Sequence, residues 1–226
     1  MRRRAILDAA AAMLTEMPVA QVTLNELSRR AGLAKSNVLR YFESREAVLL
    51  ELLDSAWQQW LIHLEESLGT AVDAHAPLAE RGDQLAAALA ASLASRPVLC
   101  DLIGAQAAVL ERNVSPQVAA QHKRAALANV SGLGRLALRC VPELGEHDAF
   151  RLAGATVMMT GAVWPNAEPS AAMLTAYETD LALASMRLDF TTTVREVIEM
   201  LIAGLLARAA RQHPRQPRRI ANPGNR

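Results

Sequence analysis

Five polar residues near the amino end of the chain are of types that can bind DNA: Lys35, Ser36, Asn37, Arg40 and Tyr41. Lysine and arginine suit phosphate oxygens, and amide, hydroxyl and phenol groups can hydrogen-bond to phosphates or to base edges in a major groove. The competing interpretation is an ordinary helical hairpin with a solvated polar face. The elements that carry these side chains decide between the two.

Two short helices are predicted around this polar set. Thr23 and Glu26 form a capping box, in which the threonine hydroxyl accepts the Glu26 N–H and the glutamate reaches back to the Thr23 N–H. A helix over residues 24–31 should follow, and Gly32 should end it because glycine adopts a left-handed conformation without steric cost. A second helix is expected over about residues 35–41.

Two such helices and their Gly-containing turn are typical of a helix-turn-helix. Four apolar side chains can point inward together and hold the second helix across the first, namely Leu27, Leu33, Val38 and Phe42. The polar set is then left on the outside, where it could meet DNA.

A longer run around these helices follows the pattern of a known family. It contains Val22-Thr23-Leu24, Glu26-Leu27, Ala31-Gly32-Leu33, Val38-Leu39, Tyr41-Phe42, Ser44-Arg45-Glu46 and Leu49-Leu50. This run resembles the N-terminal domain of the TetR family of bacterial transcriptional regulators, over roughly residues 4 to 52. The other three quarters of the chain resemble that family only in length and helical character.

The resemblance implies a homodimeric, ligand-responsive transcription factor, usually a repressor, whose second short helix enters a major groove. Half-sites would lie about one turn apart, roughly 34–36 Å. We expect Lys35, Ser36, Asn37 and Arg40 at the groove, and Thr23, Tyr41 and Arg45 at phosphates. Two residues depart from the family pattern. Ala34 stands where serine is common and Leu39 where tyrosine is usual, which removes two hydroxyl groups.

The composition indicates an all-α protein. Of 226 residues, 51% are hydrophobic and only 4% aromatic, and long stretches lack proline and β-branched runs. The chain has no run of 18 or more consecutive apolar residues, so we expect no membrane-spanning helix. Arg2, Arg3 and Arg4 resemble the start of a signal peptide, but Asp8 and Glu16 interrupt the apolar run that should follow. We therefore expect a cytoplasmic protein with no membrane partner.

The net charge of +1 hides a strong asymmetry. Residues 1–46 carry eight Lys/Arg and five Asp/Glu, residues 208–226 carry six Arg and no acid, and the stretch between holds ten bases and eighteen acids. An acidic body with a basic head suits a protein that presents one end to a polyanion. The three basic residues at positions 2–4 could be a loose extension that contacts phosphates or the minor groove, or a solvated terminus.

The chain is expected to form a three-helix head with the helix-turn-helix (residues 1–46), a helical body for ligand binding and dimerisation (47–212) and a basic, disordered tail (213–226). Besides a first helix over 2–17, helices are predicted at about 45–68, 78–95, 97–111, 115–141, 147–164 and 190–211, with a further one around 171–184. The helix 45–68 would belong to both head and body and could act as a lever.

Residues for catalysis are scarce. The five histidines share no close pairing, and the Ser-Gly-Leu-Gly sequence at 131–134 follows no strand and so is no phosphate loop. Cys100 and Cys140 fit no metal spacing, so we expect two buried thiols, with redox sensing as the alternative. The sequence therefore predicts no enzyme, no cofactor and no metal site.

A ligand pocket in the body is predicted from side chains that adapt to varied ligands, although a helical stripe of such residues is more often plain core. These are Trp60, Cys100, Ile103, Met158, Met159 and Trp164. Few charged residues interrupt the apolar stretches, which favours a mainly apolar or aromatic small molecule.

The last two long helices are expected to form a four-helix contact with a two-fold mate, through Val157, Gly161, Val194, Ile198, Leu201 and Leu205. Core helices of a monomer would look similar. The sequence thus predicts a repressor that binds operator DNA as a homodimer and is released by a small ligand. The alternative is a helical dimer that binds a small molecule or a protein and whose head no longer binds specific DNA.

Overall fold

The computed structural model describes residues 2–212, and every regular element in that range is a helix or a helical turn, as expected for an all-α chain. The expected tail, 213–226, lies outside the described residues. Within the described range, no single helix is long and apolar enough to cross a membrane; one pair of helices, broken by a bend of 89°, passes that test jointly.

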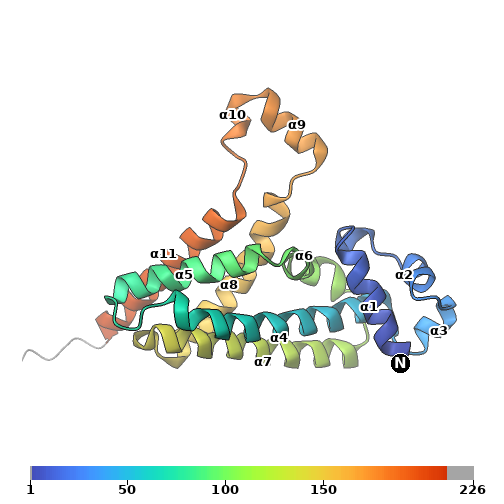
Figure 1. Cartoon of the computed structure of the whole chain (residues 1–226), viewed down its shortest axis with the longest axis horizontal. Coiled ribbons are helices and arrows are strands. Elements are labelled where there is room, and N and C mark those ends of the chain that lie inside the picture. Colours follow the sequence, from blue (N-terminus) through green and yellow to red (C-terminus); the bar gives the residue numbers. More distant parts are fainter. Residues whose placement is uncertain (1, 213–226) are drawn as a thin grey trace, which may run out of the picture.

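The head is built from three helices and a short turn (Figure 1): α1 (Arg2–Leu14), η1 (Val19–Gln21), α2 (Leu24–Arg30) and α3 (Lys35–Leu39). Burial of Ile6 and Met13 from α1 together with Leu27 and Val38 holds the short helices in place. The Thr23 hydroxyl accepts the Glu26 N–H at 3.2 Å.

Gly32, at φ +64°, ends α2 as predicted, since only glycine adopts this conformation freely. Of the four residues expected to point inward, Leu27, Val38 and Phe42 are buried, and Leu33 is half-buried.

One long helix, α4 (Arg45–Ala71), joins the head to the body. Ser44 caps it by accepting the Ala47 N–H at 3.1 Å. At about 1.5 Å per residue the helix is roughly 40 Å long. It continues three residues beyond the predicted end at 68, and the expected boundary between head and body at 46/47 falls inside its first turn. Both parts therefore share one continuous helix.

The body consists of α5 (Leu78–Ala94), α6 (Pro97–Ala105), the π-helical turn η2 (Gln106–Leu110), α7 (Pro116–Cys140), η3 (Pro142–Leu144), α8 (Gly145–Ala167), α9 (Ala171–Thr179), α10 (Leu181–Ala184) and α11 (Phe190–Gln212). The helix α4 packs against α7 and also against α5 and α6, while α8 packs against α6, α7 and α11. Figure 1 shows α4, α5 and α7 running side by side, with α9 and α10 standing apart.

The helix α11 is held by its own chain more firmly than the sequence suggested. Val194 and Ile198 are fully buried, and α11 packs on α5 as well as on α8. A Cβ added at Gly82 of α5 would lie 3.1 Å from Cγ2 of Ile202, so the two helices approach closely. Val194 and Ile198 therefore belong to the core of one chain, which corrects the expectation that they face a partner.

Candidate nucleic-acid interface and effector groove

The polar face of α3 points to solvent. Lys35, Ser36 and Arg40 are exposed, Tyr41 is 38% exposed, and Asn37 is half-buried. The helix is shorter than the predicted 35–41 and ends at Leu39. The reason is a tighter last turn, in which the Tyr41 N–H bonds the carbonyl of the residue three places back at 2.9 Å.

Ion pairs separate the eight basic residues of the head into two groups. Five of them contact carboxylates within the protein: Arg3 pairs with Glu51, Arg4 with Asp8, Arg29 with Glu26, Arg30 with Glu16 and Glu26, and Arg45 with Glu46. For Arg2, Lys35 and Arg40 no ion pair occurs within residues 2–212. These three cations are therefore available to phosphates without breaking an internal pair.

The side chain of Arg45 holds the head together. Its Nε donates to Oε1 of Glu46 at 2.8 Å, and its Nη1 donates to the carbonyl of Val22. The guanidinium thus ties the start of α4 to the loop before α2, and these bonds use two of its five N–H donors. Nothing in the sequence near Arg45 signals this pairing with Val22, which is 23 residues away.

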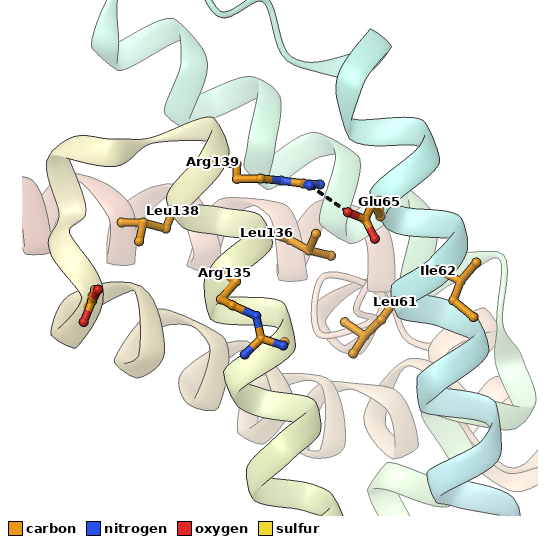
Figure 2. A pocket seen from close by; sticks show the side chains of 9 residues that line it. Leu61, Ile62, Glu65, Arg135, Leu136, Leu138 and Arg139 are labelled. Carbon is orange, nitrogen blue, oxygen red and sulfur yellow. Dashed lines mark hydrogen bonds and ion pairs between the residues drawn. The ribbon is translucent and has the colours of Figure 1, made fainter.

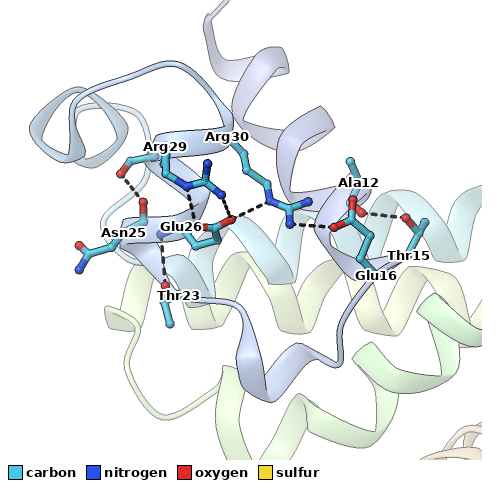
Figure 3. A network of polar contacts seen from close by, with 9 residues as sticks. Ala12, Thr15, Glu16, Thr23, Asn25, Glu26, Arg29 and Arg30 are labelled. Carbon is cyan, nitrogen blue, oxygen red and sulfur yellow. Dashed lines mark hydrogen bonds and ion pairs between the residues drawn. The ribbon is translucent and has the colours of Figure 1, made fainter.

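A network of carboxylates and guanidiniums fixes α2 against α1 (Figure 3). Glu26 accepts hydrogen bonds from Arg29 and Arg30, and Arg30 also pairs with Glu16 of the segment after α1 at 2.7 Å. The guanidiniums of Arg29 and Arg30 lower the pKa of Glu26 to about 2. The Glu26 carboxylate is directed to these arginines rather than back to the Thr23 N–H, so only the threonine half of the predicted capping box forms. The Thr23 hydroxyl still has its own proton to donate.

The basic N-terminal stretch is helical instead of loose, because α1 begins at Arg2. Arg3 pairs with Glu51, donates to the Tyr41 carbonyl at 2.9 Å and lies 4.2 Å above the Phe42 ring centroid. The arginine thereby positions the end of the turn after α3.

The six residues predicted to line a ligand pocket are not gathered around one cavity. Trp60 and Cys100 are in the core, and the Trp60 indole donates to Ser92 Oγ at 3.0 Å. Ile103 is also buried, and its side chain meets Gly161 across the α6–α8 contact. Met158 is 71% exposed and so lines no interior site. A helical stripe of this kind does not distinguish core from surface.

The two remaining residues of that set are half-buried. Met159 packs on the core, and Trp164 meets Phe190 edge-on with ring centroids 5.1 Å apart. Burial raises the pKa of the Cys100 thiol to about 12, which keeps it protonated and unreactive.

A groove of about 550 Å³ instead lies between α4, α7 and the start of α8 (Figure 2). Its apolar lining comes from Leu61 and Ile62 of α4 and from Leu136 and Leu138 of α7. Polar side chains complete the lining, namely Glu65, Arg135, Arg139 and Glu146, and Arg139 pairs with Glu65 at 2.6 Å. Leucine patterns alone could not reveal this groove, since it arises from the separation between two helices.

An unpaired donor lies one helical turn from the groove. Trp57 is 3% exposed, and within the described chain its Nε1 has no hydrogen-bond partner. On α4 it lies between Trp60, which is bonded to α5, and Asp54, which accepts a bond from Asn129 of α7 at 2.8 Å. The indole therefore points into the interior of the body, where a donor without an acceptor costs about 1–3 kcal/mol.

Hydrogen bonds also link head and body directly. The Val19 N–H donates to Oδ2 of Asp101 at 2.7 Å, and the Ser115 N–H donates to Oε1 of Glu43 at 2.5 Å. Beside the second bond lies a cleft of about 340 Å³, lined by Phe42 at the end of the head and by the first turns of α7. The cleft thus separates part of the head from α7 beside the bond between Ser115 and Glu43.

Two family models match the chain. One, described as bacterial regulatory proteins of the tetR family, matches residues 6–52. The other, described as a tetracyclin repressor-like C-terminal domain, matches residues 54–209. Together they cover both head and body.

Individual relatives agree with these models. The HTH-type transcriptional regulator EthR of Mycobacterium tuberculosis is 40% identical over 58 residues, which are 26% of this chain and 27% of that protein. The match therefore spans about a quarter of the length of this curated relative. A TetR transcriptional regulator from Rhodococcus sp. RHA1 aligns with a TM-score of 0.55 at 15% identity, covering 91% of this chain and 95% of that one.

The fatty acid degradation regulator FadR from Bacillus halodurans aligns with a TM-score of 0.52 at 16% identity, over 89% of this chain and 98% of that one. At these identities the solved structures show a shared fold alone.

Proposed function

Because the chain belongs to the TetR family of bacterial transcriptional regulators, we propose that it is a homodimeric repressor that leaves its operator when a small molecule binds the body. The observation that carries this proposal is the exposed face of α3, where Lys35 and Arg40 have no ion pair within the described residues. Every other described head cation except Arg2 contacts a carboxylate of the protein.

We expect the residues on the exposed face of α3 to make two kinds of contact with DNA, one with base edges and one with phosphates. Asn37 and Ser36 present an amide and a hydroxyl, which can read base edges, and a good bidentate base contact gives about 1–3 kcal/mol of discrimination. Lys35 and Arg40 supply charge and can also bind guanine. We assign the Thr23 hydroxyl and the Tyr41 phenol to phosphates, which is supported by the exposure of both residues. For Arg45 we now favour a structural role over a phosphate contact, because two of its donors are used inside the head.

The dimer contact that we propose uses the outer faces of α8 and α11. On α8 the exposed or half-buried residues include Gly154, Val157 and Met158, and on α11 they include Met200 and Gly204. A Cβ at either glycine would meet nothing within 4 Å in the single chain, which leaves room for a second copy to approach closely. Leu201 and Leu205, half-buried at the edge of the core, would lie at the rim of this contact.

For the effector we propose the groove between α4 and α7. Its leucine and isoleucine lining suits a mainly apolar molecule, and its volume is in the range of small-molecule sites. The indole N–H of Trp57 is the donor that an acceptor on the ligand, such as a carbonyl or carboxyl oxygen, would satisfy. A ligand that enters the groove beside Leu61, which lies one turn along α4 from Trp57, would approach this indole.

The same two helices that line the groove also reach the head. The helix α4 begins in the head, and the first residues of α7 meet Glu43 at Ser115. A ligand that separates α4 from α7 at the groove would shift both of these connections and change the placement of α3. The protein then dissociates from its operator because the ligand has a higher affinity for the conformation that does not bind DNA.

Titration of the full chain against DNA tests the proposal. Fluorescence anisotropy at fixed salt would compare duplexes flanking its own gene with a shuffled duplex of equal length. We expect one flanking duplex to bind at least about 100-fold more tightly than the shuffled one. Asn37→Ala should reduce that preference, and Lys35→Ala should weaken binding to both duplexes. Equal micromolar binding to all duplexes would contradict the proposal.

The second candidate function is a dimeric module that does not bind specific DNA. It is favoured by Ala34, which gives α3 no side-chain cap, and by Leu39, which is 43% exposed where a hydroxyl would serve a DNA contact better. Under this alternative Asn37→Ala would leave binding to every duplex unchanged, whereas compounds that bind the groove would still raise the melting temperature.

A further inference from the structure

Between α8 and α11 the chain forms a projection, residues 168–189, that we call the α9–α10 arm. Its two helices pack against each other and make few contacts with the rest of the chain. Figure 1 shows the arm standing away from the body, with α4 and α7 on the other side of the molecule. None of the residues 170–189 is buried, and the first buried residue after them is Phe190.

The arm exposes an unusual number of large apolar side chains. Leu181 is 93% exposed, Met186 64% and Met173 46%, and Leu183 and Leu188 are exposed as well. Nearly half of the large apolar side chains that are exposed in the described chain are in this short segment. Single exposed apolar side chains are ordinary on a protein surface, whereas a large apolar patch marks an interaction site.

The helices of the arm are short and gain little stability from packing on the rest of the chain. The longer one, α9, has nine residues, whereas an isolated helix shorter than about 12–15 residues is marginal in water. Ser170 and Asp180 cap the two helices, so their ends are defined by local bonds. Caps alone do not bury apolar area, which must supply most of the stability of a helix in a folded protein.

The position of the arm favours a second copy of this chain as the partner of these exposed side chains. The arm begins where α8 ends and ends where α11 begins, and these are the two helices whose outer faces carry Met158 and Met200. A second copy placed on those faces would lie beside the base of the arm. The apolar surface of the arm and that of the two helices would then form one continuous interface.

Charge argues against a lipid surface as the partner. The arm contains four carboxylates, at Glu168, Glu178, Asp180 and Asp189, and one cation, Arg187. A segment with this excess of negative charge is repelled by anionic lipid head groups. A protein surface need not be negatively charged and so need not repel the arm.

We propose that the α9–α10 arm clasps the second protomer, with Leu181 and Met186 buried against it. This inference rests on the homodimer of the proposed function and adds to it a contact outside α8 and α11. Each dimer contains two arms, so a change in one side chain acts twice on the dimer.

Sedimentation velocity on the full chain tests the clasp through the dimer dissociation constant. Leu181→Ser is compared with Leu127→Ser, a matched change on α7, where Leu127 is 59% exposed and lies away from the arm. We expect Leu181→Ser to raise the dissociation constant at least about tenfold and Leu127→Ser to leave it within about twofold. Circular dichroism would verify that both variants keep the wild-type helix content.

A second measurement does not depend on weakening the dimer. A photoreactive benzoylphenylalanine at position 181 should give a covalent dimer on irradiation, and the same group at position 127 should not. If the wild type is a dimer but Leu181→Ser does not change the dissociation constant and position 181 cross-links only within its own chain, the clasp is wrong and the proposed dimer stands. A wild type that is monomeric at every concentration would overturn both.

Discussion

The N–H of Ser115 donates a hydrogen bond of 2.5 Å to Oε1 of Glu43, joining the first turn of α7 to the loop between α3 and α4. Ser115 also caps α7 by accepting the Val118 N–H at 3.3 Å. One residue of the body therefore holds its own helix and the head at the same time. In the proposed mechanism, this bond is one of the two routes by which the groove acts on α3.

Replacing Glu43 should loosen that connection. Glu43→Ala removes the acceptor, so we expect the amides of the first turn of α7 to exchange hydrogen faster, while those of α8 exchange as in the wild type. Glu43→Gln keeps a carbonyl oxygen at the same place and should retain most of the protection. Hydrogen-exchange mass spectrometry measures both. Equal exchange in the wild type and the alanine variant would show that the bond carries no coupling.

Arg45→Ala should lower the stability of the head. Glu46 is 5% exposed, and loss of the guanidinium would leave its carboxylate buried without its charged partner. We expect a loss of about 1–3 kcal/mol in the free energy of unfolding. Urea denaturation followed by circular dichroism gives this value. If the variant is as stable as the wild type and binds DNA with a reduced salt dependence, the result would instead support the phosphate contact predicted for Arg45 from the sequence.

Acid should weaken the network around Glu26. Its pKa is lowered to about 2 in the folded chain from an ordinary 4.5, so its contribution to stability is complete above about pH 4.5 and is lost as the pH falls toward 2. The Glu26→Gln variant lacks this titration. The stability difference between wild type and variant should therefore be constant above pH 5 and shrink toward pH 2 in urea melts. A difference that does not vary over this range would contradict the assignment.

Gly132→Ala should narrow the groove between α4 and α7 that we propose for the effector, without harming the fold. A Cβ at this position would lie 2.9 Å from Cδ1 of Leu61, the flexible end of a side chain that lines the groove, so Leu61 must move. Alanine also favours the helix by about 1 kcal/mol over glycine. We expect a melting temperature at or above that of the wild type.

Ligand binding to the same variant is measured with a thermal-shift screen of small apolar carbonyl compounds. Those that stabilise the wild type should shift Gly132→Ala much less. Gly69→Ala is the matched control, because a Cβ there meets nothing within 4 Å. If the two alanine variants respond to the compounds as strongly as the wild type, the groove is not the effector site.

Local signals in the sequence were sufficient for the start and end of α2 and for the start of α4, but not for the ends of α1 and α3, which lie at Leu14 and Leu39 instead of about 17 and 41. Thr23, Ser44 and Gly32 each act on backbone groups within four residues, so their roles follow from residue type and spacing alone. Proline positions and apolar periodicity also located the body helices, but α8 continues through Pro165 to Ala167 instead of ending at 164, and the helix expected around 171–184 is divided into α9 and α10. Both kinds of signal concern one helix at a time.

Relationships between distant helices could not be read in this way. The partner of Arg3 is 48 residues away, and that of Arg45 includes a carbonyl 23 residues away. Similarly, an apolar stripe shows that α11 buries one face, but not that Val194 and Ile198 bury it against α5 of the same chain. The groove between α4 and α7 depends on such packing, which explains why the predicted pocket residues lie elsewhere.

The proposed contact between α3 and duplex DNA is tested most directly by comparing two exposed arginines of the head. Arg40 has no ion pair among residues 2–212, whereas Arg29 is paired with Glu26 at 2.5 Å. Anisotropy titrations of Arg40→Ala and Arg29→Ala at several salt concentrations, with the duplex that the wild type binds most tightly, would measure both affinity and its salt dependence. We predict that Arg40→Ala weakens binding at least about tenfold and lowers the salt slope by about 1, while Arg29→Ala changes neither appreciably. An Arg40→Ala variant with wild-type affinity and slope would contradict the placement of α3 on DNA.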